Sequence, residues 1–173
     1  MHHGNAQHAG AAADRDGSHA GQLISFAIGD DQYGVDIMAV REIRGWVDIT
    51  PLPEQPDYIR GVLDLRGTVV SIMDLRRRFN QGLTQATPMH IVIVVQIDGK
   101  PIGLLADRVL DIVSVDPEQL RPVPAVAQSA RVSFLSGLIS AADGMIAIID
   151  LNNLLAEEAV VGATNASPIS TAA

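Results

Sequence analysis

The sequence predicts an all-β protein made of two small barrels that pack against each other. Short segments rich in aliphatic and β-branched residues alternate with turns that contain Gly, Asp or Pro. The order of these segments is repeated: a shift of 69 residues places Gly34 on Gly103, and a shift of 76 residues places Gly61 on Gly137. Such self-similarity indicates an internal duplication. Each half is too small to be very stable alone, so the two barrels are expected to share a packed interface.

The first predicted element is a β-hairpin that begins at Gln22. A run with apolar side chains at every second position is followed by an acidic, glycine-containing turn at 29–31 and a second apolar run at 33–37. Period-2 alternation is typical of strands that bury one face, and a short turn between two such runs favours antiparallel pairing. Two adjacent strands are therefore expected here.

The next stretch, 38–46, leaves two interpretations open. Val40 and Ile43 suit either a helix or a strand, because periodicity cannot separate the two in so short a run. Prolines between residues 50 and 56 then restrict the backbone and predict a stiff connector. The connector is expected to end in a short apolar turn at 58–63.

A single basic residue, Arg66, follows that turn and immediately precedes Gly67. Residues 68–72 are rich in β-branched side chains and predict a buried strand. The guanidinium of Arg66 can bind a carboxylate through two hydrogen bonds, and Glu42 is a candidate for that carboxylate. The alternative is an ordinary surface ion pair, which contributes roughly 0 to 1 kcal/mol.

Both halves end their last predicted strand with Asp-Leu, at Asp74 and Asp150. An aspartate at such a position more often accepts hydrogen bonds from loop amides than acts as an acid catalyst, so a structural role is expected. In the second half, strands are expected at 91–97 and 100–106 across a two-residue Asp-Gly turn. A single helical turn is predicted at 116–118, followed near the end by a short C-terminal helix over 151–160.

Composition narrows the functional classes. The formal net charge of −8 and the pI of about 4.9 argue against a nucleic-acid partner, which would need clustered Lys and Arg. The chain has no cysteine, and its longest apolar run is far too short to span a membrane, so a cytoplasmic protein is expected. Residues 1–21 and 160–173 contain little that could be buried and are expected to be disordered tails.

Five sequence motifs follow one another in an order that is typical of one known protein family. They read FAIGDDQYGVDIMAVREIRGW, PDYIRGVLDLRGTVVSIMDLRRRF, IGLLADRVLDIV, FLSGLIS and IAIIDLNNLL, and all of them lie between Gln22 and Leu155. This order resembles the CheW family of chemotaxis coupling proteins. The resemblance implies two intertwined SH3-like five-stranded β-barrels with short helical turns. It also implies one CheW-like domain at 22–159, with barrel subdomains at about 22–88 and 89–155.

The same resemblance implies an adaptor that performs no catalysis and needs no cofactor. Such a protein couples the cytoplasmic tips of transmembrane chemoreceptors to a CheA-type histidine kinase, and it meets the membrane only indirectly, within receptor arrays. By similarity, the positions used for coupling are Val40, Glu42, Gly61 and Arg66, and the internal repeat adds Val109 as the counterpart of Val40. A CheW-like scaffold serving a non-flagellar pathway is the alternative within the family.

Val40 and Val109 are equivalent under the repeat, so they are expected to line opposite walls of a groove between the barrels. Such a groove would suit the apolar face of a receptor helix. Arg108 departs from the family pattern, because a glycine is common at this position. A long cation there could either block a receptor helix or recruit an acidic one.

Enzymatic interpretations receive little support. The sequence contains none of the motifs GxSxG, GxxxxGK[ST], GxGxxG or HExxH, and His90 is the only histidine outside the N-terminal tail. The alternative from a different class is a hydrolase or ligand-binding double barrel that uses His90, as a base, or the acidic turn residues. Substitution of His90 or of Arg66 would discriminate between the enzyme and the adaptor. No metal site is predicted.

Overall fold

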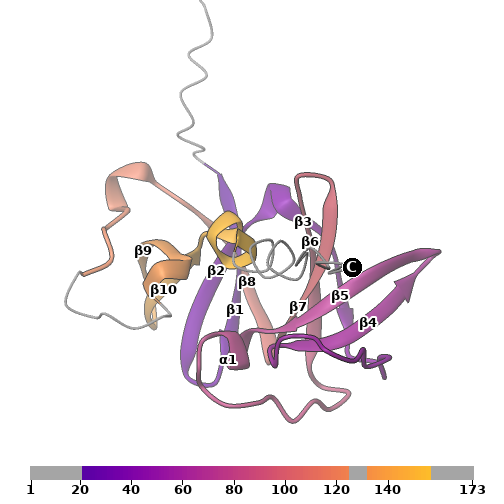
Figure 1. Ribbon diagram of the computed structural model, residues 1–173. Helices are drawn as coiled ribbons and strands as arrows, with labels where there is room; N and C mark the ends of the chain where they lie inside the picture. The colour runs from indigo at the N-terminus through magenta and orange to yellow at the C-terminus, as the bar shows by residue number, and fades with distance from the viewer. Residues whose placement is uncertain (1–20, 125–131, 157–173) are drawn as a thin grey trace, which may run out of the picture.

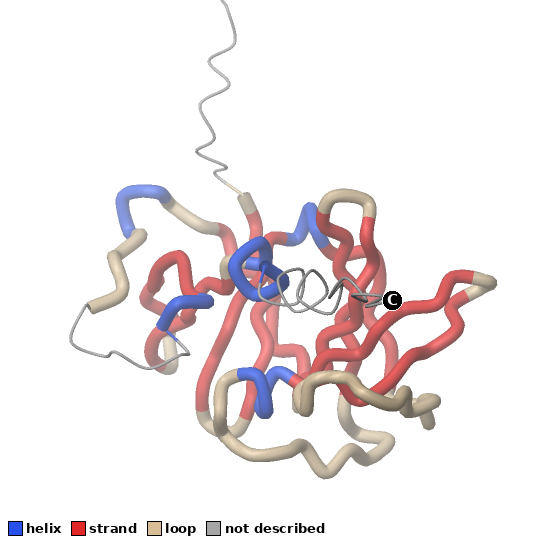
Figure 2. Tube along the Cα trace, in the orientation of Figure 1, coloured by secondary structure: helices blue, strands red, loops and turns tan. Residues whose placement is uncertain are grey.

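The structure is a computed structural model that describes residues 21–124 and 132–156. The described part consists mainly of strands, with only short helical segments (Figure 2), which confirms the predicted all-β class. The strands are β1 Gln22–Ile28, β2 Asp31–Asp36, β3 Val40–Gly45, β4 Ile59–Leu65, β5 Thr68–Asp74, β6 Ile91–Ile97, β7 Lys100–Ala106, β8 Arg108–Ser114, β9 Leu135–Ala141 and β10 Gly144–Ile149. The helical segments are η1 Ile37–Ala39, α1 Leu75–Arg78, η2 Pro117–Gln119, η3 Val132–Phe134 and residues 151–156.

The strands form two five-stranded sheets that exchange strands between the sequence halves (Figure 1). Sheet A has the order β8-β1-β2-β10-β9, and sheet B has the order β3-β6-β7-β5-β4. Under the repeat, β1, β2 and β3 correspond to β6, β7 and β8, while β4 and β5 correspond to β9 and β10. Replacing each strand by its counterpart converts the order of one sheet into the order of the other. Sheet A thus combines the first hairpin with three strands of the second half, and sheet B does the reverse. The barrels are intertwined, and a boundary near residue 88 separates the sequence repeats but not the sheets.

The exchange also appears in the register of the strands. Each sheet contains one parallel pair between the halves, β2 with β10 and β5 with β7. In these pairs Ile148 lies opposite Gly34, and Ile72 lies opposite Gly103. These two pairs are equivalent under the repeat, so the duplicated halves form the same contacts in both barrels.

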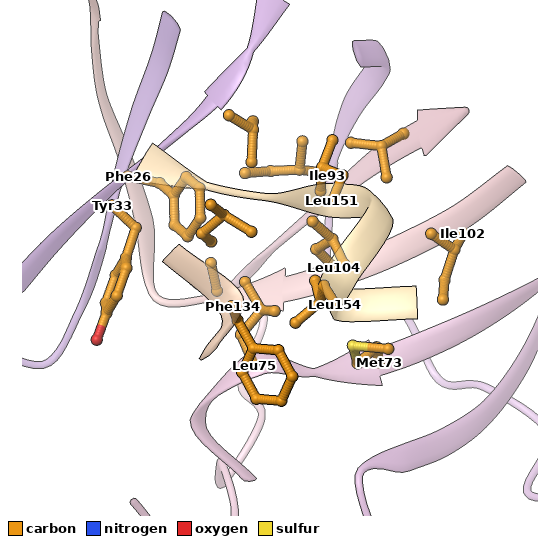
Figure 3. Packing of buried hydrophobic residues seen from close by; sticks show 14 of the residues in the cluster. Phe26, Tyr33, Met73, Leu75, Ile93, Ile102, Leu104, Phe134, Leu151 and Leu154 are labelled. Atoms are coloured by element: carbon orange, nitrogen blue, oxygen red, sulfur yellow. The ribbon is translucent and has the colours of Figure 1, made fainter. Parts of the chain in front are cut away.

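Most of the apolar core lies between the two sheets (Figure 3). Phe26 and Tyr33 come from sheet A, Ile93 and Leu104 come from sheet B, and Leu154 comes from the C-terminal helical segment. Smaller clusters fill the individual barrels, around Val70 in sheet B and around Ile146 in sheet A. Fully burying one aliphatic side chain stabilises a protein by about 1.5–3 kcal/mol. Because the largest cluster is shared, neither barrel keeps its core without the other.

The predicted apolar turn at 58–63 is wrong. Residues Ile59–Leu65 form strand β4, which pairs antiparallel with β5 across a two-residue turn at Arg66 and Gly67. Both turn residues have positive φ, 51° and 87°, as in the hairpin turns whose twist matches that of the strands. The strand was missed because Gly61 interrupts the alternation of apolar residues in this run, and a glycine normally argues against the interior of a strand.

Stretch 38–46, for which helix and strand were both left open, is mostly the strand β3. Other sequence predictions are confirmed. Asp116 caps the short helix η2 by accepting from the N–H of Glu118. Asp74 accepts hydrogen bonds from the N–H and the hydroxyl of Thr84, at 2.8 and 2.7 Å. Asp150 accepts from the N–H of Asn153 in the helical segment 151–156, so both strand-end aspartates have the predicted structural role as acceptors. The two tails, and the helix predicted beyond residue 156, lie outside the described residues.

Candidate functional site

Strands β3 and β8 are the sheet edges that carry most of the predicted coupling residues. Each lies at one end of its sheet and pairs with one neighbour. Paired residues of antiparallel strands point to the same face, so an edge residue opposite a core residue lies at the rim of that core. Four apolar edge residues pair in this way with members of the core between the sheets: Val40 with Val95, Ile43 with Ile93, Val109 with Phe26, and Ile112 with Ile24.

These edges leave apolar surface uncovered. Ile43 is 39% exposed and Ile112 is 55% exposed, and they are counterparts under the repeat. All but one residue of β8 are exposed, although four of its seven residues are apolar. An exposed apolar sheet edge is a site where another chain can bind. The geometry therefore identifies β3 and β8 as the candidate interaction surface.

The structure also brings Glu42 and Arg66 together as an ion pair. The pair connects edge strand β3 to the β4–β5 turn, which lie at opposite ends of the strand order of sheet B. The side chain of Asp64 accepts from the N–H of Gly67 at 2.8 Å and so fixes the turn that presents Arg66. Arg44 lies 3.8 Å from the same Glu42 carboxylate. Because the Arg66 side chain is 80% exposed, this pair contributes only about 0–1 kcal/mol to folding.

The second barrel shows that the fold does not require this pair. The counterpart of Glu42 is Asp111, whose carboxylate accepts from the N–H of Ile112 at 2.7 Å. The counterpart of Arg66 is Ala142, which carries no charge. Sheet A nevertheless has the same five-strand order as sheet B. The charged pair is thus a point where the two halves differ, and this difference favours a role in recognition over a role in stability.

Gly61 lies inside β4 and is buried. Its φ is +145°, and a Cβ at this position would stand 2.2 Å from the carbonyl oxygen of Thr50. The connector lies against β4 here, and Thr50 and Val62 exchange backbone hydrogen bonds of 3.0 and 2.8 Å. Gly61 therefore allows the connector to lie against β4, and it presents no side chain of its own to the surface.

Arg108 lies on the opposite face of β8 from Val109. Ala27 pairs with Arg108 and Phe26 pairs with Val109, with no bulge between the two pairs. Successive side chains of a strand alternate between faces. The Arg108 side chain therefore points away from the core between the sheets, while Val109 lies on its rim.

A polar cluster that sequence reasoning missed surrounds Asp107, the single residue between β7 of sheet B and β8 of sheet A. Its Oδ2 accepts from the N–H of Gly29 and from Arg76, both at 2.7 Å, and His90 Nε2 lies 3.4 Å from its Oδ1. Burial alone would raise the pKa of Asp107, but the Gly29 N–H, Arg76 and His90 outweigh it and lower that pKa. No motif marked Asp107, because its partners come from distant parts of the chain.

His90 occupies a turn in which its Nδ1 is already used. The N–H of Thr87 lies 3.0 Å from Nδ1, and the Thr87 hydroxyl lies at the same distance. A general base needs a free lone pair facing the nucleophile, whereas here the Thr87 amide occupies Nδ1 and Nε2 faces the Asp107 carboxylate. The hydrolase alternative gains no support from this geometry. Among residues 21–124 and 132–156, no cluster of three potential metal ligands occurs, and no helix is long and apolar enough to cross a membrane.

Known proteins resemble this chain over nearly all of its described part. The sequence model of the CheW-like domain matches residues 22–159. The "Chemotaxis protein CheW" of Rhizobium meliloti is 39% identical over 137 residues, 79% of this chain and 88% of that protein. The protein of the same name from Klebsiella aerogenes is 36% identical, covering 79% and 82% of the two chains. The crystal structure of the scaffolding protein TtCheW from Thermoanaerobacter tengcongensis matches with a TM-score of 0.71 and 32% identity, over 78% of this chain and 87% of that one. This chain therefore belongs to the CheW-like domain family.

Proposed function

We propose that this protein is a chemotaxis adaptor that couples transmembrane chemoreceptors to a CheA-type histidine kinase through protein contacts, without catalysis. The observation that carries the proposal is the family match over residues 22–159, together with a relative named as a chemotaxis protein at 39% identity over most of both chains. The adaptor acts in the cytoplasm and reaches the inner face of the membrane through the receptors. It requires no cofactor, metal or nucleic acid.

An adaptor needs two surfaces that can be occupied at the same time. In this proposal the rims at β3 and β8, with Val40 and Val109, receive the apolar face of a receptor helix. Their equivalent positions beside the shared core support this assignment. The kinase is bound elsewhere, at the end of one barrel. Such an arrangement holds receptor and kinase on one rigid body.

The Glu42–Arg66 pair contributes specificity at the rim of the receptor surface. Exposed charges at an interface mainly select partners and speed association, while they add little affinity. The high exposure of Arg66 and the lack of a corresponding pair in the second barrel support this role. Arg108, on the other face of β8, neither blocks the helix nor contacts it.

The working unit in this proposal is residues 22–159. A protein trimmed to these residues is expected to keep the melting temperature and partner affinities of the full chain, because the tails contain little that could be buried.

The test is a reconstitution with the kinase and a membrane-bound receptor from the same organism. Receptor-dependent phosphorylation of the kinase should rise strongly when the full chain is added and should stay at its basal level without it. Co-sedimentation with receptor-containing vesicles should place both the chain and the kinase in the pellet. If the chain binds neither protein and leaves kinase activity unchanged, the proposed function is wrong.

A further inference from the structure

The side chain of Arg78 lies at the centre of the intertwined fold. Arg78 is 8% exposed, and its guanidinium carbon lies 4.3 Å from the ring centroid of Tyr58 and 4.3 Å from that of Phe134. A guanidinium stacked on an aromatic face is attracted to it electrostatically, and more strongly when it is removed from water. One cation therefore connects two aromatic rings of different sequence halves.

Those two rings are counterparts under the duplication. Tyr58 and Phe134 are 76 residues apart, the spacing that also relates Asp74 to Asp150. Their backbones make the same contact: the carbonyl of Tyr58 accepts from the N–H of Asp74 at 2.7 Å, and the carbonyl of Phe134 accepts from the N–H of Asp150 at 2.7 Å. Because the guanidinium is equally far from these two corresponding rings, it lies midway between equivalent parts of the two halves.

A hydrogen bond completes this arrangement. Arg78 Nη2 donates to the carbonyl of Leu154 at 3.1 Å, and Leu154 is the residue that corresponds to Arg78 in the second half. Leu154 is fully buried in the core between the sheets. Because Arg78 follows β5 of sheet B while Leu154 follows β10 of sheet A, the bond connects corresponding ends of the two barrels.

We infer that Arg78 is a positioning residue that fixes the angle between the two barrels and thereby aligns the two edge strands that receive the receptor. The inference rests on the proposed function, in which the receptor surface combines β3 of sheet B with β8 of sheet A. A change in the angle between the barrels would misalign these edges. The kinase contact lies on one barrel and does not depend on that angle.

The variants are chosen to separate this role from general stability. Arg78→Leu places at this position the residue that the other half carries, and it removes both stacking contacts and the hydrogen bond to Leu154. Arg78→Lys keeps the positive charge but lacks the planar group that stacks on both rings. Arg77→Leu is the matched control, since Arg77 is the neighbouring arginine of α1 and pairs at the surface with Asp57.

The direct readout is the distance between the barrels, measured by pulsed electron resonance between two spin labels. The chain has no cysteine, so Val69→Cys and Met145→Cys provide unique labelling sites. These exposed residues are counterparts on β5 and β10, one in each sheet. We expect a narrow distribution in the otherwise wild-type chain and in Arg77→Leu, and a shifted or broadened one in Arg78→Leu and Arg78→Lys.

The functional readout is the affinity for receptor-containing vesicles and, separately, for the kinase. Both Arg78 variants should bind the receptor at least about tenfold more weakly and the kinase with unchanged affinity. If a variant fails to fold, as judged by circular dichroism, the other gives the result. Wild-type distance distributions in every folded Arg78 variant, or equal losses for receptor and kinase, would overturn the inference while leaving the proposed function intact. A wild-type chain that binds neither protein would instead overturn the proposed function.

Discussion

Replacing Gly61 by alanine tests whether this position acts through the backbone. Two costs are expected. A residue with a side chain is strained at a φ of +145°, by about 1–3 kcal/mol. The new methyl group would also stand 2.2 Å from the Thr50 carbonyl oxygen, so the connector or the strand must move. Overpacking of this kind costs about 1–3 kcal/mol more.

Gly144→Ala is the matched control. Gly144 has a φ of +136°, almost the same as that of Gly61, but nothing lies within 4 Å of a Cβ placed there. The control therefore includes the backbone strain and lacks the clash. The free energy of unfolding should fall by about 1–3 kcal/mol more in Gly61→Ala than in Gly144→Ala. For a chain of this length the melting temperature should differ by about 2–12 °C.

Urea denaturation followed by circular dichroism and by tryptophan fluorescence measures both effects. Trp46 is the only tryptophan and lies near the start of the connector, so its emission should shift in folded Gly61→Ala if the connector moves. Receptor coupling should decline in the same variant even when it is corrected for the folded fraction. Equal destabilisation by the two substitutions, with unchanged Trp46 emission, would refute the assignment of Gly61 to the contact with Thr50.

Two further predictions follow from the charged groups. Arg66→Gln should change the free energy of unfolding by less than about 1 kcal/mol, because the side chain is 80% exposed, yet it should reduce receptor-dependent kinase activation; Arg108→Gln is the control, and equal activation by both variants would contradict the role of Arg66. Because the pKa of Asp107 is lowered in the folded state, its carboxylate adds stability above the unfolded value near 3.8 that is lost as the pH falls through the folded value. Asp107→Asn should therefore be less stable than wild type in urea denaturation at pH 6, and the difference should vanish toward pH 2; a difference that does not vary with pH would contradict this.

Local patterns in the sequence were sufficient for the β1–β2 and β6–β7 hairpins, for the cap at Asp116 and for the duplication, but not for the β4–β5 hairpin. The Asp98–Gly99 turn and the strands beside it could be predicted because turn chemistry and period-2 alternation depend on adjacent residues. Asp74 and Asp150 could be assigned as acceptors for the same reason, since their partners lie ten and three residues further along the chain. The approach of Glu42 to Arg66 was predicted from complementary charge together with the family resemblance.

The tertiary structure decided how distant segments are combined into sheets and which of their buried residues meet. The sequence alone determined that there are two equivalent barrels, because a repeat is visible in the order of its residues. It did not determine which strands share a sheet, since the exchange between halves is set by the large core that both halves must bury together. Gly29 meets Asp107 across 78 residues, and Arg78 meets Leu154 across 76. Local sequence patterns do not predict such pairs, because the residues next to each partner do not determine which distant segment will pack beside that partner.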